Sequence, residues 1–378
     1  MISSVQEPAS LITLEGRHYL SPCYVGLRGN HMAMSTDRAI TIKDVAAHAD
    51  VSVATVSAVI NENKYVSPEL VQRVQASIAM LGYQRNSFAR GLKTQLSHCI
   101  GLIIPDLANP FYTNIARGAE DVAHAHNYSL ILGNTDDDPE KEKKYLQLLD
   151  SKQADGLIIA VTNHSYAYLQ SLPIQNLALV SIDRSLFDLG IDTVLVENKE
   201  GAKSAIEHLI SLGHRRIGLL TGARGIAPTE ERLQGYTESL EMHGIPIDPA
   251  LIVTTSARVE GGELGASRLL SLAEPPTAIF LMDGTMAIGA LQTIERLGLR
   301  CPEDIAIASF DDFVWASVMR PRLTVVDQPT YEIGQQAARL LFDRLQNRER
   351  APKEVRLPTK FIIRESSGAS LRASPNTL

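Results

Sequence analysis

The chain has 378 residues, of which 44% are apolar and 21% are charged, values typical of a soluble globular protein with two or three domains. Its formal net charge of −7 argues against a protein that is basic throughout. No run approaches the roughly 18 apolar residues of a membrane span. The cysteines Cys23, Cys99 and Cys301 are far apart and form no C-x-x-C, which indicates neither a disulfide framework nor a zinc site and favours a reducing cytoplasm.

Residues 1–38 are predicted to be a disordered tail or a start assigned too early, since Met32 or Met34 would begin the chain just before the first helix. The segment has no basic start, and Glu7 and Glu15 bracket its short apolar run, so it does not read as an export signal. Residues 368–378 are expected to form a second tail.

Residues 39–84 predict a compact head of three helices. Thr41 is a good N-cap for the first helix, Asp50 occupies a tight turn, and Ser52 begins the second helix. Apolar side chains fall on one face of each helix and would close into a small core. Residues 37–93 carry seven Lys or Arg and five Asp or Glu, so the head is mildly basic while the chain beyond it is acidic.

The second helix presents small and hydroxyl side chains on its other face. Such a face fits closely into a DNA major groove, where Ser and Thr reach phosphates or bases and methyl groups touch thymine. The alternative is an ordinary helical hairpin with a solvated face. The residues of this expected face are Ser52, Val53, Ala54, Thr55, Ser57, Ala58 and Asn61.

The third helix begins at Ser67-Pro68-Glu69, an N-cap followed by a first-turn proline and an early acid, and ends at Gly82. Residues 85–97 follow, with too little apolar surface to hold a fold alone. They predict either a plain linker or a hinge helix that forms only when it docks against a partner.

From residue 98 to residue 367, short apolar runs alternate with amphipathic helical stretches. This rhythm predicts an α/β fold of two doubly wound parallel-sheet lobes, with a ligand cleft beyond the carboxyl ends of the strands. We place the first lobe at about 98–197 plus 328–347, and the second at about 198–327 plus 348–367. The expected strands include 100–105, 129–133, 156–161, 177–182, 216–221, 251–255, 278–282 and 305–310; the expected helices include 111–127, 140–152, 203–213, 230–243 and 285–298.

An ordered set of motifs resembles the lactose/galactose repressor (LacI/GalR) family over about residues 39–367. The head shows TIKDVAAHADVSVATVSAVIN, YVSPE, LGYQRN and FARGLK. The body shows IGLIIPDLANPFY, ADGLIIA, VSIDR, HLISLGHRRIGLLTG, ERLQGY, MDGTMAIGAL, EDIAIASFDD and PRLTVVDQP. The resemblance implies a cytoplasmic homodimer that binds a near-palindromic double-stranded operator and responds to a small sugar-like effector. It implies periplasmic-binding-protein-like lobes and no cofactor.

The resemblance also assigns residues to DNA contact. The second-helix face would enter the major groove, although Ala58 stands where many relatives carry a larger polar or basic side chain. Leu92 would wedge between central base pairs from the minor groove, or else be a buried interdomain leucine. Gly91 weakens the hinge helix, which we predict to be disordered without operator. Phosphate or sugar contacts are implied for Thr41, Tyr65, Ser67, Tyr83 and Asn86.

The resemblance places an effector site in the cleft. A guanidinium and carboxylates engage neighbouring hydroxyls with paired hydrogen bonds, and aromatic rings cover apolar sugar faces. For each acid the alternative is a helix N-cap or a solvated loop charge. The carboxylates favour a neutral sugar over a sugar acid, and Asp283-Gly284 replaces the more usual Asn-Asp. The implied residues are Phe111, Tyr112, Asp183, Arg232, Asp283, Asp311 and Trp315.

The sequence therefore predicts an effector-controlled, operator-binding repressor of carbohydrate metabolism or transport genes. The chain has no H-E-x-x-H, G-x-S-x-G, P-loop or G-x-G-x-x-G motif, so we expect neither an enzyme nor catalytic or metal-ligating residues. The remaining alternative is a sugar-binding protein without a DNA role, which the head and the absence of an export signal disfavour.

Overall fold

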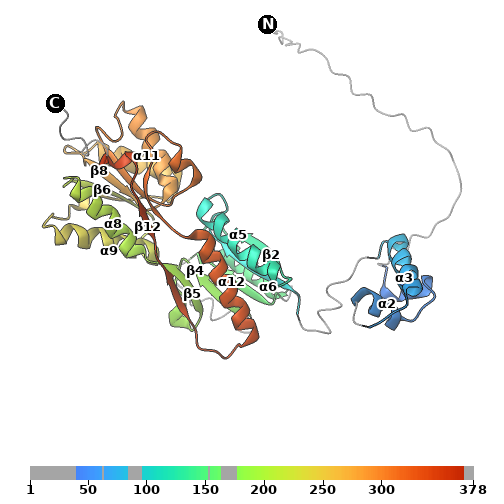
Figure 1. The fold of residues 1–378 in the computed structure, drawn as a ribbon. Helices are drawn as coiled ribbons and strands as arrows, with labels where there is room; N and C mark the ends of the chain where they lie inside the picture. Colours follow the sequence, from blue (N-terminus) through green and yellow to red (C-terminus); the bar gives the residue numbers. More distant parts are fainter. Residues whose placement is uncertain (1–39, 62–63, 84–95, 152–153, 163–176, 370–378) are drawn as a thin grey trace, which may run out of the picture. The chain divides into compact units, whose positions relative to one another are not determined.

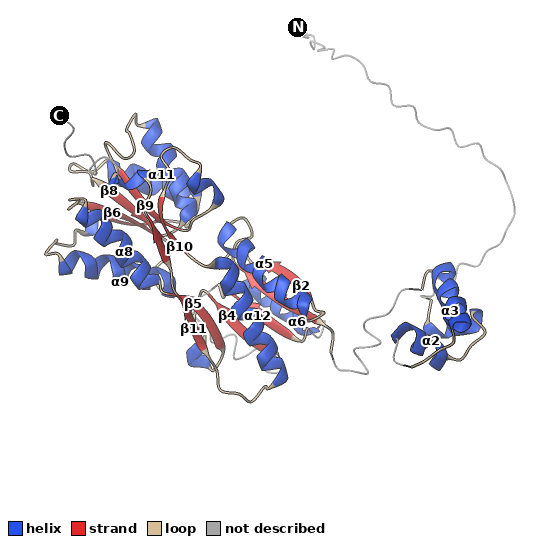
Figure 2. Cartoon of the chain, in the orientation of Figure 1, coloured by secondary structure: helices blue, strands red, loops and turns tan. Residues whose placement is uncertain are grey.

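The structure is a computed structural model that describes residues 40–61, 64–83, 96–151, 154–162 and 177–369 (Figures 1 and 2). The chain divides between Arg85 and Asn86 into two compact units, a small head and a larger core. The expected tail before residue 39 and most of the expected hinge, with Asn86, Gly91 and Leu92, lie outside the described residues. Their predicted roles stay predictions.

The head contains α1 (Ile42–His48), α2 (Val53–Asn61) and α3 (Pro68–Leu81). The Asp44 carboxylate accepts hydrogen bonds from the Thr41 amide at 2.7 Å and the Thr41 hydroxyl at 2.6 Å, which fixes the start of α1. The turn to α2 needs a left-handed residue, and Asp50 adopts φ +48° there. Gly82 ends α3 at φ +62°. The Thr41 cap, the Asp50 turn and the Gly82 end are therefore confirmed, whereas the Ser67 side chain accepts no capping hydrogen bond.

A small apolar core holds the three helices of the head together. Val45, Val56 and Val74, one from each helix, have no exposed surface. The Arg73 guanidinium donates to the Ala49 carbonyl at 2.6 Å and so satisfies a backbone group at the end of α1. This packing leaves one side of α2 available for contact outside the head.

The core contains two six-stranded sheets, one in each lobe. The first has the order β11-β5-β4-β3-β1-β2 and the second the order β12-β10-β9-β8-β6-β7; all their pairs are parallel except β10 with β12. The two lobes therefore repeat one topology, apart from the edge strand. The strands are β1 (Cys99–Ile104), β2 (Ser129–Asn134), β3 (Gly156–Ile159), β4 (Ala178–Ile182), β5 (Asp192–Val196), β6 (Ile217–Thr221), β7 (Ile252–Thr254), β8 (Ala278–Leu281), β9 (Ala306–Phe310), β10 (Thr324–Asp327), β11 (Glu354–Leu357) and β12 (Lys360–Ile362).

Helices cover both faces of each sheet. In the first lobe, α5 (Pro110–Ala125) and α12 (Thr330–Gln346) pack on one face and α6 (Pro139–Ser151) on the other. In the second lobe, α8 (Asn198–Ser211) and α9 (Ala227–Met242) cover one face, and α10 (Val259–Leu270) and α11 (Gly284–Arg296) the other. Figure 1 shows α12, from the end of the chain, beside α5. This layering confirms the predicted doubly wound α/β lobes.

The helices α5 and α12 approach each other closely through two glycines. A side chain on Gly118 would meet the Tyr331 carbonyl oxygen at 2.0 Å, and one on Gly334 would meet the Ile115 carbonyl oxygen at 2.0 Å. Only glycine fits at such a crossing. The pair fixes the last long helix to the first lobe, although almost the whole second lobe lies between them in sequence.

The chain crosses between the lobes after β5, after β10 and after β11. The predicted lobe boundaries are correct at the first two crossings. The assignment of residues 348–367 to the second lobe is wrong for its first half, because β11 pairs with β5 in the first sheet, with Val355 opposite Val194. The 17-residue α12 runs along the first lobe, so the chain returns along that lobe before β12 joins the second.

Candidate functional site

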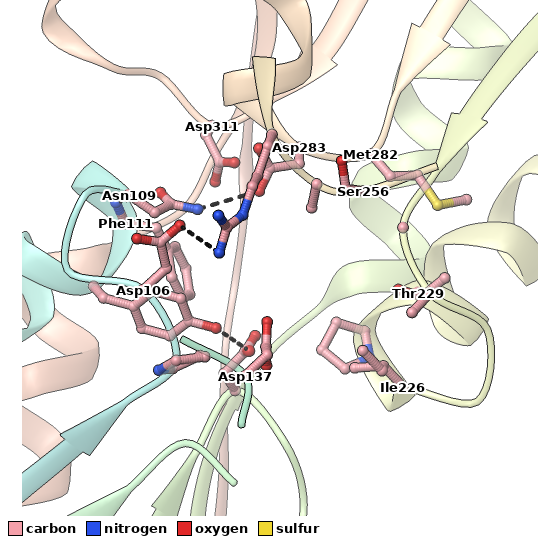
Figure 3. A pocket seen from close by; sticks show the side chains of 18 of the residues that line it. Asp106, Asn109, Phe111, Asp137, Ile226, Thr229, Ser256, Met282, Asp283 and Asp311 are labelled. Atoms are coloured by element: carbon pink, nitrogen blue, oxygen red, sulfur yellow. Dashed lines mark hydrogen bonds and ion pairs between the residues drawn. The ribbon is translucent and has the colours of Figure 1, made fainter. Parts of the chain in front are cut away.

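A cleft of about 310 Å³ lies between the two lobes. Its lining residues lie in the loops that follow the strands and in the helices after them, at the edge where the carboxyl ends of both parallel sheets meet. Figure 3 shows side chains of both lobes converging on this space. Six of the seven predicted effector residues line it, namely Phe111, Tyr112, Asp183, Arg232, Asp283 and Asp311.

Asp183 and Asp311 occupy equivalent places in the two lobes. Asp183 follows β4 and Asp311 follows β9, and both adopt the left-handed conformation, with φ +62° and +69°. The Asp183 amide donates to the Val194 carbonyl on the neighbouring strand, and the Asp311 amide donates in the same way to Val326. Non-glycine residues rarely adopt this conformation, and here it turns one carboxylate of each lobe towards the cleft.

The Asp183 carboxylate belongs to a polar group on the first lobe. The Tyr112 hydroxyl donates to it at 2.9 Å, and the Arg184 guanidinium lies 3.9 Å away. Arg184 also donates to the Val161 carbonyl and to Asp137 at 3.1 Å. Burial raises the pKa of Asp183, while the Arg184 charge opposes that rise.

The Asp311 carboxylate lies on the second lobe and is 4% exposed. It accepts hydrogen bonds from the Gly284 amide at 3.0 Å and from the Gln328 side-chain amide at 2.6 Å. Burial, followed by the negative charge of Asp283, raises the pKa of Asp311 to about 7. Near neutral pH this carboxyl therefore acts either as a hydrogen-bond donor or as an acceptor.

Arg232 lies at the back of the cleft in α9. Its guanidinium donates to Asn198 at 2.8 Å and to the Met282 carbonyl, and it stacks over the Phe310 ring at 3.8 Å. These contacts hold the guanidinium in a single orientation. It therefore offers a fixed donor group to a bound molecule.

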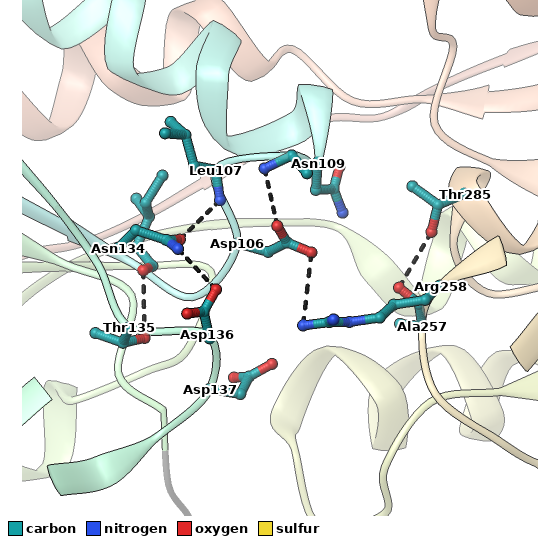
Figure 4. Close-up of polar contacts among 12 residues, drawn as sticks. Asp106, Leu107, Asn109, Asn134, Thr135, Asp136, Asp137, Ala257, Arg258 and Thr285 are labelled. Atoms are coloured by element: carbon teal, nitrogen blue, oxygen red, sulfur yellow. Dashed lines mark hydrogen bonds and ion pairs between the residues drawn. The ribbon is translucent and has the colours of Figure 1, made fainter. Parts of the chain in front are cut away.

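Two polar contacts join the lobes across the cleft itself, and Arg356 of β11 also donates to Glu231 of α9 at 3.0 Å. The Asn109 side-chain amide donates to Asp283 at 3.3 Å, and Asp106 lies 4.0 Å from Arg258 at the rim (Figures 3 and 4). Asn109 and Asp283 also cap helices: Asn109 accepts from the Phe111 amide at the start of α5, and Asp283 from the Thr285 amide at the start of α11. Burial raises the pKa of Asp283.

Trp315, the seventh predicted effector residue, is not among the residues that line the cleft. The indole packs against Phe313, with ring centroids 5.4 Å apart, and against the apolar clusters of both lobes. The reason is packing: burying a large aromatic ring between the two lobes removes more apolar surface from water than exposing it in a polar cleft.

Four residues that contact the predicted ones were missed, namely Asn109, Asp137, Arg184 and Gln328. Each directly follows, or closely follows, an apolar strand. Their position after an apolar strand was the sequence signal that could have identified them. The same position after a strand led to the prediction of Asp183 and Asp311, whereas Asn109 and Gln328, which are uncharged, were not predicted.

The head exposes one side of α2 to solvent. Ser52, Val53, Ala54 and Asn61 are exposed, and Thr55 and Ser57 are half-buried. Ala58, which was expected on the exposed or partly exposed face, is instead buried, with 8% of it accessible. The Asn61 side-chain amide donates to the Ser57 carbonyl at 2.8 Å, one turn back along α2.

The five residues predicted to contact phosphates differ in exposure. Tyr65 is 91% exposed, whereas Thr41, Ser67 and Tyr83 are half-buried. Tyr83 packs against the apolar core of the head. Asn86 lies outside the described residues.

Within the described part of the chain, no group of His, Cys, Asp and Glu side chains is arranged to hold a metal ion. No described helix is both long and apolar enough to cross a membrane.

Comparison with known proteins matches both units of the chain. Residues 41–86 match the bacterial regulatory proteins of the lacI family, and residues 206–367 match a periplasmic binding protein-like domain. A ribose operon repressor of Halalkalibacterium halodurans is 36% identical over 327 residues, covering 86% of this chain and 97% of the relative.

Two solved structures extend the comparison. The lac repressor dimer bound to operator and the anti-inducer ONPF is 26% identical, with a TM-score of 0.78, and the match covers 87% of this chain and 99% of that one. A LacI family transcriptional regulator from Enterococcus faecium with bound ribose is 32% identical, with a TM-score of 0.66, over 71% of this chain and 98% of that one.

Proposed function

Because the chain belongs to the LacI family of bacterial regulatory proteins, we propose that it is a cytoplasmic, dimeric repressor of carbohydrate genes whose operator affinity is set by a small sugar-like effector. The observation that carries the proposal is that one chain joins a DNA-binding head to a two-lobed core with a polar, ordered cleft. A sugar-binding protein without a DNA role is not favoured, because residues 41–86 match the regulatory head.

The exposed side of α2 supports a major-groove contact. Ser52 and Thr55 bring hydroxyls to the start of the helix, Val53 and Ala54 bring methyl groups, and Asn61 brings an amide at its end. Hydroxyls and amides reach base edges and phosphates, whereas methyl groups contact thymine. Ala58 is left out of this surface because it is buried.

The cleft supports a compact ligand rich in hydroxyl groups. Carboxylates of both lobes and two fixed guanidiniums form paired hydrogen bonds with neighbouring hydroxyls. Phe111 and Tyr112 lie edge to face, with centroids 4.9 Å apart, and supply apolar surface beside them. A volume of about 310 Å³ matches the lower end of small-molecule sites.

The effector acts, in this proposal, by a population shift between lobe arrangements. A ligand that contacts both lobes favours one separation of the lobes, and a difference of ~1–3 kcal/mol between arrangements changes operator affinity about 5- to 150-fold. A dimer lets two heads reach the two halves of a near-palindromic operator. No catalytic reaction is part of the proposal.

Fluorescence anisotropy with the DNA upstream of the chain's own gene tests the proposal. The full-length protein is titrated at stated salt, alone and with a panel of sugars and sugar phosphates. Specific binding that one compound weakens identifies an inducer, whereas binding that one compound strengthens identifies a corepressor. Binding no stronger than to scrambled DNA, across genomic fragments as well, would contradict the DNA-binding role.

A matched pair of variants checks that α2 reads the operator. Asn61→Ala removes an exposed amide from the proposed surface and should weaken specific binding by ~1–3 kcal/mol. Met80→Ala removes a side chain that is 76% exposed on α3 and should leave binding unchanged. Equal losses in both variants would indicate a general effect on the head.

A further inference from the structure

The cleft lining carries more negative than positive groups. The five carboxyl-bearing residues are Asp106, Asp137, Asp183, Asp283 and Asp311, and the three arginines are Arg184, Arg232 and Arg258. A cleft built only for neutral hydroxyl groups does not need this excess, because each extra buried carboxylate costs desolvation free energy.

Near the opening of the cleft, each carboxylate lies close to an arginine. Asp106 lies 4.0 Å from Arg258, and Asp137 lies 3.1 Å from Arg184. These pairs are partly exposed, with 54% of the Asp137 and Arg258 side chains accessible, so solvent also stabilises them. The unbalanced charge therefore lies deeper in the cleft.

The deeper carboxyls are those of Asp183, Asp283 and Asp311. The charge of Arg232 acts on all three, but its hydrogen bonds go to Asn198 and the Met282 carbonyl rather than to a carboxylate. Among the described ion pairs, Arg232 takes part in none, and Asp183 has only the 3.9 Å contact with Arg184. Buried carboxyls in this situation keep a proton or attract a cation. Burial raises the pKa of all three.

Two buried polar groups of the cleft wall have no hydrogen-bond partner among the described residues, which favours a ligand that carries hydrogen-bond donors. Gln328 is 4% exposed, its amide nitrogen donates to Asp311, and its carbonyl oxygen Oε1 has no partner. The Thr255 hydroxyl, also on the cleft wall, has no partner either. An unsatisfied buried acceptor beside the Asp311 carboxyl fits a donor group that carries several N–H bonds.

We propose that the effector is a compact amine-bearing polyol, of the amino-sugar or imino-sugar class, whose ammonium group lies between Asp283, Asp311 and the Gln328 carbonyl oxygen. Its hydroxyls face Asp183 and Arg184, where Arg184 Nε is buried without a hydrogen-bond partner. This inference rests on the proposed function, since it names the ligand of the same cleft. Charge is conserved on binding, because a proton held by the Asp311 carboxyl passes to solvent when the ammonium takes its place.

Isothermal titration calorimetry on the full-length protein at neutral pH tests the inference with two matched sets of ligands. One set is ribose and 1,4-dideoxy-1,4-imino-D-ribitol; the other is glucose, glucosamine and N-acetylglucosamine. In at least one set the amine should bind about tenfold or more tightly than its neutral counterpart, since a charge-assisted hydrogen bond exceeds a neutral one by more than about 1 kcal/mol. Acetylation removes the charge and should abolish the gain.

The Asp283→Asn variant tests the position of the ammonium. Asparagine caps a helix as well as aspartate does, so α11 keeps its start while the cleft loses one carboxylate. Amine affinity should fall about tenfold while neutral-sugar affinity holds or rises. Asp138→Asn is the matched control, because Asp138 also caps a helix, accepting from the Glu140 amide at 2.9 Å, but does not line the cleft.

The outcomes separate the inference from the proposed function. A neutral sugar that binds as tightly as its amine and alters operator binding would overturn the inference and leave the proposed function standing. An amine preference that Asp283→Asn and Asp138→Asn leave equally unchanged would overturn the assigned position. Absence of binding by every compound, with operator binding unaltered, would overturn both the inference and the sugar-like effector of the proposed function.

Discussion

The Asn109 side chain joins the two lobes of the core, since its amide donates to the Asp283 carboxylate at 3.3 Å across the cleft. Each of these side chains also begins a helix, Asn109 at α5 and Asp283 at α11. A ligand that enters between them therefore acts on the amino-terminal ends of one helix in each lobe. This is a direct structural route from ligand contact to lobe position.

Substitutions of Asn109 distinguish its role as the cap of α5 from its contact with the second lobe. Asn109→Ala removes the cap and the contact between the lobes, and should cost about 1 kcal/mol of core stability as well as part of the effector response. Asn109→Ser keeps a good cap but cannot reach Asp283, so stability should return while the response stays reduced. Thermal denaturation and effector-dependent anisotropy measure the two effects. A response fully restored by serine would show that the contact between lobes is not used.

Gly284 lies where the packing beside the cleft leaves no room for a side chain. A Cβ atom there would lie 2.8 Å from the Phe313 ring and 2.9 Å from the Asp311 Cβ. Gly284→Ala should therefore displace Asp311, destabilise the core by ~1–3 kcal/mol and weaken effector binding, while operator binding without effector persists. Gly222→Ala also adds a methyl group to the cleft lining but meets no atom closer than 3.7 Å, so it controls for the added methyl group without displacing Asp311. Calorimetry with equal affinities for the two variants would contradict this account.

Sequence patterns predicted the strand-end acids because apolar runs end visibly at Asp183 and Asp311, and the carboxyl edge of a parallel sheet is the general place for ligands. The same patterns could not show that Asn109 meets Asp283, which is 174 residues away. The packing of Trp315 against both lobes could not be predicted for a similar reason, since it depends on contacts distant in sequence. The pairing of β11 with β5 could not be predicted either, because a short edge strand carries little pattern of its own.

The head was more fully predicted than the cleft because its determinants are local. The Thr41 cap, the left-handed Asp50 and the Gly82 end each involve neighbours within a few residues. The burial of Ala58 was not predicted because helical periodicity gives the direction of a side chain and not how far neighbouring residues cover it.

The core should lose stability as the pH rises from about 4 to about 7 through the titration of Asp311. The folded-state pKa of about 7 lies above the ordinary value of 3.8, so the folded core binds this proton more tightly than the unfolded chain. The resulting penalty is absent below the lower pKa and complete above the higher one. Asp311→Asn should flatten this part of the profile in thermal denaturation measured against pH.

Glu142 titrates in the same window, because burial raises its pKa to about 7 as well. The informative quantity is therefore the difference between the parent and Asp311→Asn profiles. Asp138→Asn, at an exposed cap, provides the control. A difference that stays constant from pH 4 to pH 7 would mean that Asp311 does not change its protonation on unfolding in this range.

Trp315 should report lobe movement by its fluorescence. It is the only tryptophan in the chain, and it packs beside Phe313 where the apolar clusters of the two lobes meet. A change in lobe separation alters the exposure of the indole, so saturating effector should shift the emission maximum or intensity. Trp315→Phe should remove the signal while binding persists in calorimetry. Effector binding with unchanged Trp315 emission would indicate that the lobes keep their separation, and the proposed population shift would then require a different moving element.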